Sequence, residues 1–201
     1  HLCNVAQKAA EFADAFGAGD WGYVAGLWHD VGKYSAAFQT YLRASQEASA
    51  ESLPGRVDHS TAGAQHAVET FPLIGHLLAY CIAGHHSGLL DGQSVGSNQR
   101  DRLCKAVEPW RHGLAELPSP SAPALPAFVP AALGRRDAFG SAFFTRMVFS
   151  CLVDADFWTP NGLCRGLLAR MRALFFQPLE ASLRPFPSRW KSWTATRCRR
   201  R

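Results

Sequence analysis

The stretch Leu27-Trp28-His29-Asp30-Val31-Gly32-Lys33 places an imidazole beside a carboxylate, and adjacent His and Asp side chains can share metal ions. A carboxylate has two oxygens, so Asp30 can bridge two ions while His29 binds one. Such nitrogen and oxygen ligands suit Mn, Fe, Co, Ni or Zn better than Mg or Ca. Taken alone, the pair has a second interpretation, in which Asp30 caps a helix beside a half-buried His29.

Three further clusters of metal-ligating residue types occur along the chain, and His1 precedes them. Adjacent histidines such as His85 and His86 point about 100° apart on a helix, so both are rarely satisfied in a core. The flanking Gly84 and Gly88 allow the backbone to bend until both rings meet one ion. The clusters are Asp58-His59-Ser60, Gly84-His85-His86-Ser87-Gly88 and Asp154-Ala155-Asp156.

The Asp58 cluster is expected to begin a helix. Asp58 would N-cap this helix, so that His59 would lie at its N-terminus. The hydroxyls of Ser60 and Thr61 could fix the orientation of the His59 imidazole. Three other histidines are expected to be ordinary helix residues, namely His66, His76 and His112.

Asp154 and Asp156 lie in an apolar segment, where a carboxylate needs a cation, a hydrogen-bond partner or solvent. Residues two apart on a helix do not face the same point, so one is expected to bind metal and the other to be structural. The residues alone leave open which of the two binds metal. Together the clusters predict a binuclear metal site.

Length and composition favour one globular domain, since 201 residues with 47% hydrophobic and 18% charged side chains can bury a substantial core. Helical spacing of apolar residues and the lack of strand-like alternation predict an all-α fold. Glu47–Arg56, Gly88–Asn98 and the Pro-rich 118–130 are expected to be loops, the last an extended surface loop or linker. The expected helices are 2–16, a helix N-capped by Asp20 that carries Leu27–Asp30, 35–44, 58–69, 73–83, 101–116, 139–158 and 163–181.

The formal net charge of +5 comes from the end of the chain, because residues 184–201 hold seven Lys and Arg side chains and no acidic one. The sequence therefore divides into a domain, 1–183, and a basic tail, 184–201. In one interpretation the tail binds nucleic-acid phosphates while Trp190 and Trp193 stack on bases. In the other it is a solvated, frayed terminus.

The six cysteines form no CxxC pair, which argues against a zinc ribbon and a disulfide scaffold. Most are expected to act as small buried hydrophobes. Neither a membrane span nor a signal peptide is visible, so a cytoplasmic location is expected. Because the chain begins with His1, we expect it to be part of a longer protein.

In their order along the chain, these clusters resemble the HD phosphohydrolase superfamily. The closer resemblance is to the HD nuclease domain of the CRISPR-associated helicase-nuclease of type I systems. Two traits select that branch, the His85-His86 pair after Ala83-Gly84 and the phrase Leu152-Val153-Asp154-Ala155-Asp156-Phe157. The resemblance covers about residues 1–158 and implies an HD-domain helical bundle with a binuclear metal cleft that cleaves single-stranded DNA.

The resemblance also implies a role for each residue. The first ion would be held by His1, His29, Asp30 and Asp156, and Asp30 would bridge to a second ion held by His59, His85 and His86. The resemblance favours Asp156, because superfamily members have a small residue, Asp and a large residue here, and Asp154 is the alternative. Lys33 would lie near the cleft and contact a phosphate. The two divalent ions are expected to be Mn, Fe, Co or Ni, with Mg possible.

The implied partners are single-stranded DNA, a helicase and a DNA-bound surveillance complex. The sequence has no Gly-x-x-x-x-Gly-Lys-Ser/Thr phosphate loop, so the motor is either a separate chain or a part of the protein outside these residues. Two other functions stay open. One is a phosphohydrolase of nucleotides or cyclic dinucleotides, with a closed pocket, and the other is a non-catalytic nucleic-acid-binding module with a vestigial metal site.

Overall fold

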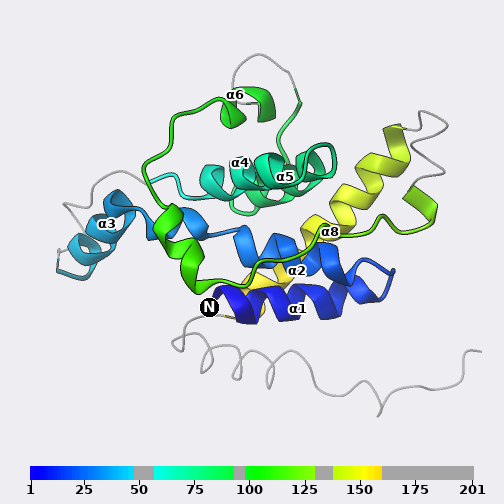
Figure 1. The fold of residues 1–201 in the computed structure, drawn as a ribbon, viewed down its shortest axis with the longest axis horizontal. Coiled ribbons are helices and arrows are strands. Elements are labelled where there is room, and N and C mark those ends of the chain that lie inside the picture. The colour runs from blue at the N-terminus through cyan, green and yellow to red at the C-terminus, as the bar shows by residue number, and fades with distance from the viewer. Residues whose placement is uncertain (48–56, 93–97, 130–137, 160–201) are drawn as a thin grey trace, which may run out of the picture. The chain divides into compact units, whose positions relative to one another are not determined.

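The computed structural model describes residues 1–47, 57–92, 98–129 and 138–159, and these confirm the all-α prediction (Figure 1). Asp91 and Asn98 form an isolated bridge and no strand occurs in these ranges. The α-helices are α1 (Leu2–Asp14), α2 (Gly19–Trp28), α3 (Ala36–Glu47), α4 (Ser60–Thr70), α5 (Ile74–Gly84), α6 (Gln99–Leu103) and α8 (Ala138–Trp158). The 3-10 helices are η1 (Val31–Tyr34) and η2 (Arg111–Glu116).

The antiparallel pair α1 and α2 forms the base of the bundle, and α4 with α5 lies over it (Figure 1). Glycine makes the first pair close, because a β carbon on Gly26 would lie 2.6 Å from the α carbon of Ala6. Helix α8 packs against α1, α2 and α5. The end of α2, the start of α4 and the end of α5 thereby meet where the rings of His29, His59 and His85 lie together, a place here termed the cleft.

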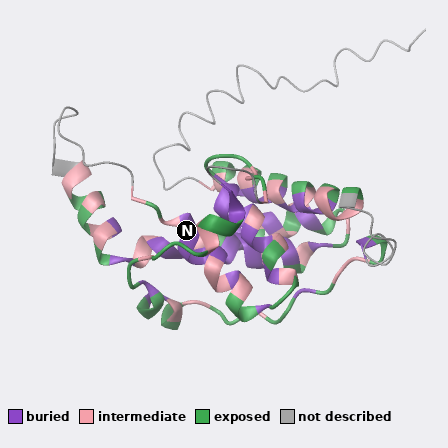
Figure 2. Cartoon of the chain, turned by 90° about the horizontal axis from the view of Figure 1, so that it is seen from above, coloured by how far each residue is buried: buried purple, intermediate pink, exposed green. Residues whose placement is uncertain are grey.

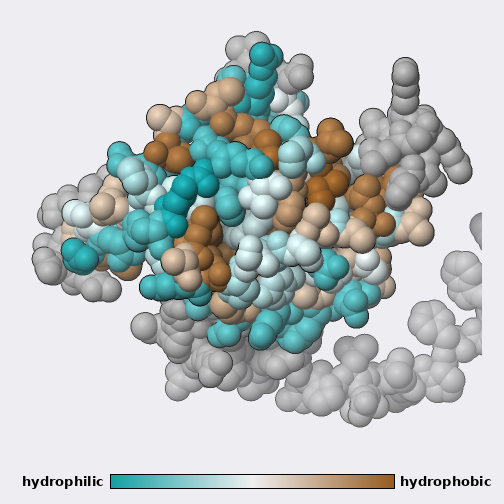
Figure 3. Space-filling model, viewed as in Figure 1, coloured by the Kyte–Doolittle hydropathy of each residue, from teal (hydrophilic) through white to brown (hydrophobic). Residues whose placement is uncertain are grey.

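The core is continuous between these helices, and Figure 2 shows the buried residues concentrated in the centre of the bundle. Trp21 and Phe144 join α2 to α8 edge to face, with ring centroids 4.9 Å apart. Hydrophilic and apolar residues are interspersed on the face seen in Figure 3. None of the described helices combines the length and apolar character of a bilayer span.

The predicted helix at 101–116 is wrong. Helix α6 ends at Leu103, residues 105–110 are not helical, and η2 begins at Arg111. Pro109 prevents one continuous helix over this range, because the residue before a proline avoids the α-helical region. The segment still buries Trp110, so its apolar spacing reflects contact with the core.

Two other expectations need smaller corrections. Asp20 does not N-cap α2, which begins at Gly19; it lies in the first turn, where its charge suits the helix dipole. The Pro-rich segment packs on α2, since the Trp21 indole N–H donates to the Ala124 carbonyl at 2.7 Å and Val129 is buried. It is therefore an extended loop and not a linker.

Among the four described cysteines, Cys81 and Cys151 are buried as expected, whereas Cys3 and Cys104 are exposed. Burial raises the pKa of both buried thiols and keeps them uncharged. The predicted helix 163–181, the tail 184–201 and most of the loop 47–56 lie outside the described residues.

Candidate metal centre

Seven side chains form two groups that share one carboxylate. The first group is His1, His29, Asp30 and Asp156, and the second group is Asp30, His59, His85 and His86. Within each group, one potential ligand atom per residue lies within 4.8 Å of the others. These are the seven residues that the sequence nominated as metal ligands.

Asp30 lies between the two groups with one oxygen facing each of them. Its Oδ2 is 3.1 Å from His29 Nε2, in the first group. Its Oδ1 is 3.2 Å from His59 Nε2 and 3.5 Å from His85 Nε2, both in the second. This is the placement that a bridging carboxylate requires.

The shared pair follows the end of α2. His29 is the C-cap residue, Asp30 follows it in the turn before η1, and their side chains are 0% and 2% exposed. The interpretation of the pair as a cap is wrong, because the Asp30 side chain makes no cap hydrogen bond and His29 is fully buried.

Three imidazoles are oriented by backbone carbonyls, which only accept hydrogen bonds. Nδ1 of His29 donates to Gly26 O at 2.7 Å, Nδ1 of His85 to Ile82 O at 2.7 Å, and Nδ1 of His59 to Val57 O at 3.1 Å. In a neutral ring the lone pair is then on Nε2, which faces the cleft. Metal-binding histidines are typically held this way by the other ring nitrogen.

The buried polar atoms of the cleft are suited to cations. Among the described residues, His29 Nε2, His85 Nε2 and both oxygens of Asp30 are buried without a hydrogen bond of acceptable geometry. Nitrogen and oxygen lone pairs converging in one place fit divalent transition metals, so the residues fit the predicted ions.

The structure distinguishes Asp156 from Asp154 near the end of α8. Asp156 Oδ1 is 3.3 Å from His1 Nε2 and 3.5 Å from His29 Nε2, whereas Asp154 is exposed and belongs to neither group. His1 directly precedes α1, where its carbonyl accepts the first helical hydrogen bonds. The packing of α8 on α1 and α2 brings these residues together.

The pKa values of His29, Asp30 and Asp156 are set by burial and by the close contacts between imidazoles and carboxylates. Burial opposes protonation of His29, but contacts with Asp156 and Asp30 outweigh it and raise its pKa to about 9. Burial alone would raise the pKa values of both carboxyl groups, yet the imidazoles hold them below their usual range. Without metal, His29 therefore carries a proton shared with two carboxylates.

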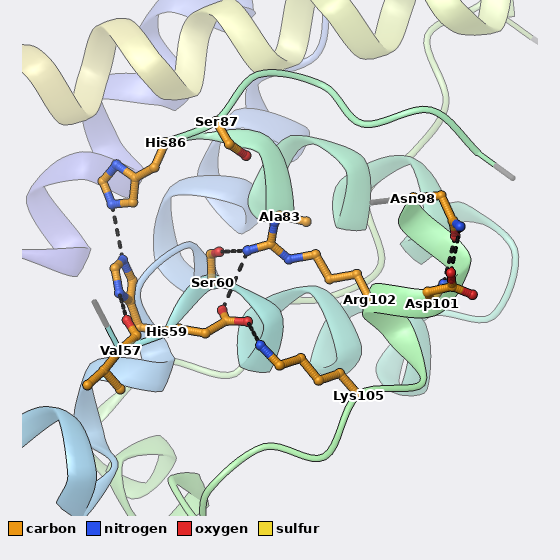
Figure 4. Close-up of a pocket in the computed structure, with 11 residues that line it drawn as sticks. Val57, His59, Ser60, Ala83, His86, Ser87, Asn98, Asp101, Arg102 and Lys105 are labelled. Atoms are coloured by element: carbon orange, nitrogen blue, oxygen red, sulfur yellow. Dashed lines mark hydrogen bonds and ion pairs between the residues drawn. The ribbon is translucent and has the colours of Figure 1, made fainter. Parts of the chain in front are cut away.

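His86 completes the second group from the turn after α5, where its Nε2 is 3.0 Å from His59 Nε2 (Figure 4). Burial and the electrostatic influence of His85 and His59 lower the pKa of His86 to about 4. The ring is neutral at ordinary pH and can bind a cation.

Lys33 lies on η1 with its Nζ 2.5 Å from Asp30 Oδ2 and with its side chain 37% exposed. The predicted Lys33 position beside the cleft is thus observed. An exposed ammonium so close to Asp30 can reach both the cleft and solvent.

Helix α4 begins at Ser60, directly after His59 of the second group. The Asp58 carboxylate accepts a hydrogen bond from the Thr61 N–H at 3.2 Å. The expectation that Ser60 and Thr61 orient the His59 ring is wrong. Their hydroxyls contact Arg102 and Asp58, and the Val57 carbonyl holds the ring instead.

The sequence did not single out Arg102 and Lys105, which line a cavity of about 550 Å³ beside His59 and His86. It also missed the carbonyls that orient the rings, because a backbone group leaves no signal in residue identity. As expected, His66, His76 and His112 lie outside both groups.

The Cas3 HD-domain family model matches residues 4–133, about two thirds of the chain. The matched range contains His29, Asp30, His59, His85 and His86, while His1 and Asp156 lie outside it. No curated protein matches the chain. The chain therefore belongs to the Cas3 HD-domain family, which consists of metal-dependent HD-type phosphohydrolases or nucleases.

Proposed function

We propose that this protein is a metal-dependent nuclease that hydrolyses phosphodiester bonds of single-stranded DNA in type I CRISPR interference. The observation that carries the proposal is the position of Asp30, whose two oxygens face two separate groups of ligands. Membership of the Cas3 HD-domain family supports a nucleic-acid substrate.

Two bound divalent ions would supply an activated water and stabilise negative charge on the phosphoryl and leaving oxygens. In the proposal, Asp30 fixes both halves of the centre, and His29 and Asp156 hold the first half with His1. His59, His85 and His86 hold the second half. Mn, Fe, Co and Ni are favoured by these ligand types, and Mg is also compatible with the carboxylates.

Lys33 is proposed to contact a phosphate oxygen of the substrate. Its ammonium is compact, partly exposed and already drawn toward the cleft by Asp30. A cation at that position can neutralise a non-bridging phosphate oxygen without occupying a metal ligand.

The proposed partners are a helicase motor, on the same or a separate chain, and the DNA-bound surveillance complex that recruits it. The motor would deliver single strand to the cleft. The exposed residues His86, Ser87 and Lys105 around the cavity make the second group accessible from solvent, as a polymer requires.

The test is cleavage of circular single-stranded DNA with Mn, Co, Ni, Mg or EDTA, for the wild type beside Asp30→Ala. Linearised circles that require both metal and Asp30 support an endonuclease with this centre. Bound metal without cutting would favour a phosphohydrolase of nucleotides or cyclic dinucleotides. Absence of bound metal would favour a non-catalytic binding module.

A further inference from the structure

A cavity of about 550 Å³ borders the second group and extends from His59 and His86 toward α6 (Figure 4). Two basic side chains enter it from α6 and from the chain just after that helix. These are Arg102 and Lys105, and both run toward the histidine side of the cavity.

Arg102 is fixed in its orientation by three polar contacts. Its Nη2 donates to Ser60 Oγ at 2.7 Å and lies 3.5 Å from Asp58 Oδ1, and its Nε donates to Thr61 Oγ1 at 2.9 Å. Among the described residues its Nη1 has no hydrogen-bond partner, so the guanidinium keeps donors available for a ligand.

Lys105 lies at the rim, with its side chain 55% exposed and its Nζ 2.8 Å from Asp58 Oδ2. Asp58 is thus one carboxylate contacted by two cations. The other acid lining the cavity, Asp101, accepts from the side-chain amide of Asn98 at 2.7 Å, away from the histidines. The histidine side of the cavity therefore carries an excess of positive charge.

We propose that Arg102 and Lys105 bind a second phosphate of the DNA strand whose scissile phosphate lies at the metal centre. This inference rests on the proposed function and deepens it, because it assigns the direction in which the strand leaves the second group. Arg102 suits a phosphate because its Nη1 can donate charge-assisted hydrogen bonds while Nε and Nη2 hold the guanidinium in place, and Lys105 adds a point charge.

The proposed phosphate subsite would distinguish a DNA strand from a small phosphodiester substrate. A strand carries a neighbouring phosphate that reaches the cavity, whereas a small diester such as bis(p-nitrophenyl) phosphate has only the scissile one. Arg102 and Lys105 act here as positioning residues, and their contribution should appear in DNA binding and KM more than in hydrolysis of the small diester.

The experiment compares the full chain with Arg102→Gln, Lys105→Gln and the control Arg100→Gln, an exposed cation on the same helix that does not line the cavity. Binding of a labelled single-stranded oligonucleotide is measured by fluorescence anisotropy in EDTA at several salt concentrations. Cleavage of the oligonucleotide and of bis(p-nitrophenyl) phosphate is then measured with Mn²⁺. Lys105→Gln keeps a variant in the series that is expected to fold, because among the described residues Asp58 is the one partner of that exposed side chain.

We expect the two cavity variants to bind DNA about tenfold more weakly or worse. The slope of log Kd against log salt should fall by about 0.7 for one lost phosphate contact. Hydrolysis of the small diester should be unchanged, and Arg100→Gln should behave as wild type. The subsite is overturned if the cavity variants bind like wild type, if Arg100→Gln weakens binding equally, or if small-diester hydrolysis falls by the same factor.

Failure of the proposed function looks different. If the wild type cuts no DNA, the anisotropy series still decides whether the two cations form a phosphate site. If the wild type cuts DNA but the cavity variants bind normally, the nuclease stands and the subsite does not.

Discussion

A β carbon on Gly32 would lie 2.1 Å from the carbonyl oxygen of His59, so only glycine lets η1 approach the residue that precedes α4. Gly32→Ala should push the two segments apart and move His59 away from Asp30. We expect the affinity for the second ion to fall about 10- to 100-fold while the first ion is retained. Titration with Mn²⁺ followed by elemental analysis would measure this.

Gly19→Ala is the matched control for that substitution. Gly19 begins α2 at the end opposite His29, and its nearest neighbour would be the Asp14 carboxylate at 3.3 Å, which can move. It should bind both ions as wild type does. Normal binding of both ions by Gly32→Ala would show that the close approach does not position His59.

The two carboxylates of the centre should differ in how many ions depend on them. Asp30 faces both groups and Asp156 only the first, so Asp156→Asn should retain one ion per chain and Asp30→Asn fewer than one. DNA cleavage should fall more than about 100-fold in both. Elemental analysis after dialysis gives the stoichiometry, with exposed Asp154→Asn as the control that keeps two ions.

Binding of the first ion should strengthen as pH rises. The pKa of His29 is about 9 without metal, so below that pH an ion must displace a proton from Nε2. Affinity should therefore fall about tenfold per pH unit between pH 8.5 and pH 6.5. Mn²⁺ titrations across this range would check it, and an affinity independent of pH would contradict the shared proton.

His66 should make folding stability sensitive to acid. Its ring meets those of Trp28 and Trp110 at centroid distances of 4.6 and 5.4 Å. Burial, reinforced by Arg111, lowers its pKa. At His66 the unfolded chain then binds a proton more readily than the folded chain. The contribution of neutral His66 to the free energy of unfolding is therefore fully present above about pH 6.5 and is lost as pH falls.

Urea unfolding at pH 7.5 and pH 5.5 tests the role of His66. His66→Gln should show a smaller loss of stability between the two pH values than the wild type. His76→Gln, an exposed histidine on α5, should lose as much as the wild type. An unchanged loss in His66→Gln would place the acid sensitivity elsewhere.

The helices that carry the cleft were predictable because their apolar spacing matches the buried face. Helix α1 buries Val5, Ala6 and Ala9, and α5 ends at Gly84 as expected. The segment around Trp110 was not predictable in the same way. Residues at helical spacing also reach the core from an irregular chain, and Pro109 was the only local sign of the interruption.

At the site, residue type and order, together with the family resemblance, nominated the seven side chains that the structure brings together. Residue type and order alone did not decide between Asp154 and Asp156, because that choice depends on how α8 is rotated against α1 and α2. Nor did they reveal Arg102, whose position beside Ser60 arises from contact between segments about 40 residues apart.

The sharing of Asp30 leaves the ligand set with only two carboxylates, Asp30 and Asp156, beside five histidines. Two divalent cations would bring four positive charges against two negative ones. The loaded cleft would therefore attract a polyanion more strongly than the cleft without metal, where protonated His29 and Lys33 balance the two carboxylates. Metal loading and strand capture would then be thermodynamically linked, each raising the affinity for the other by the same factor. The protein would then bind DNA more tightly when it is equipped to cut it than when its metal centre is empty.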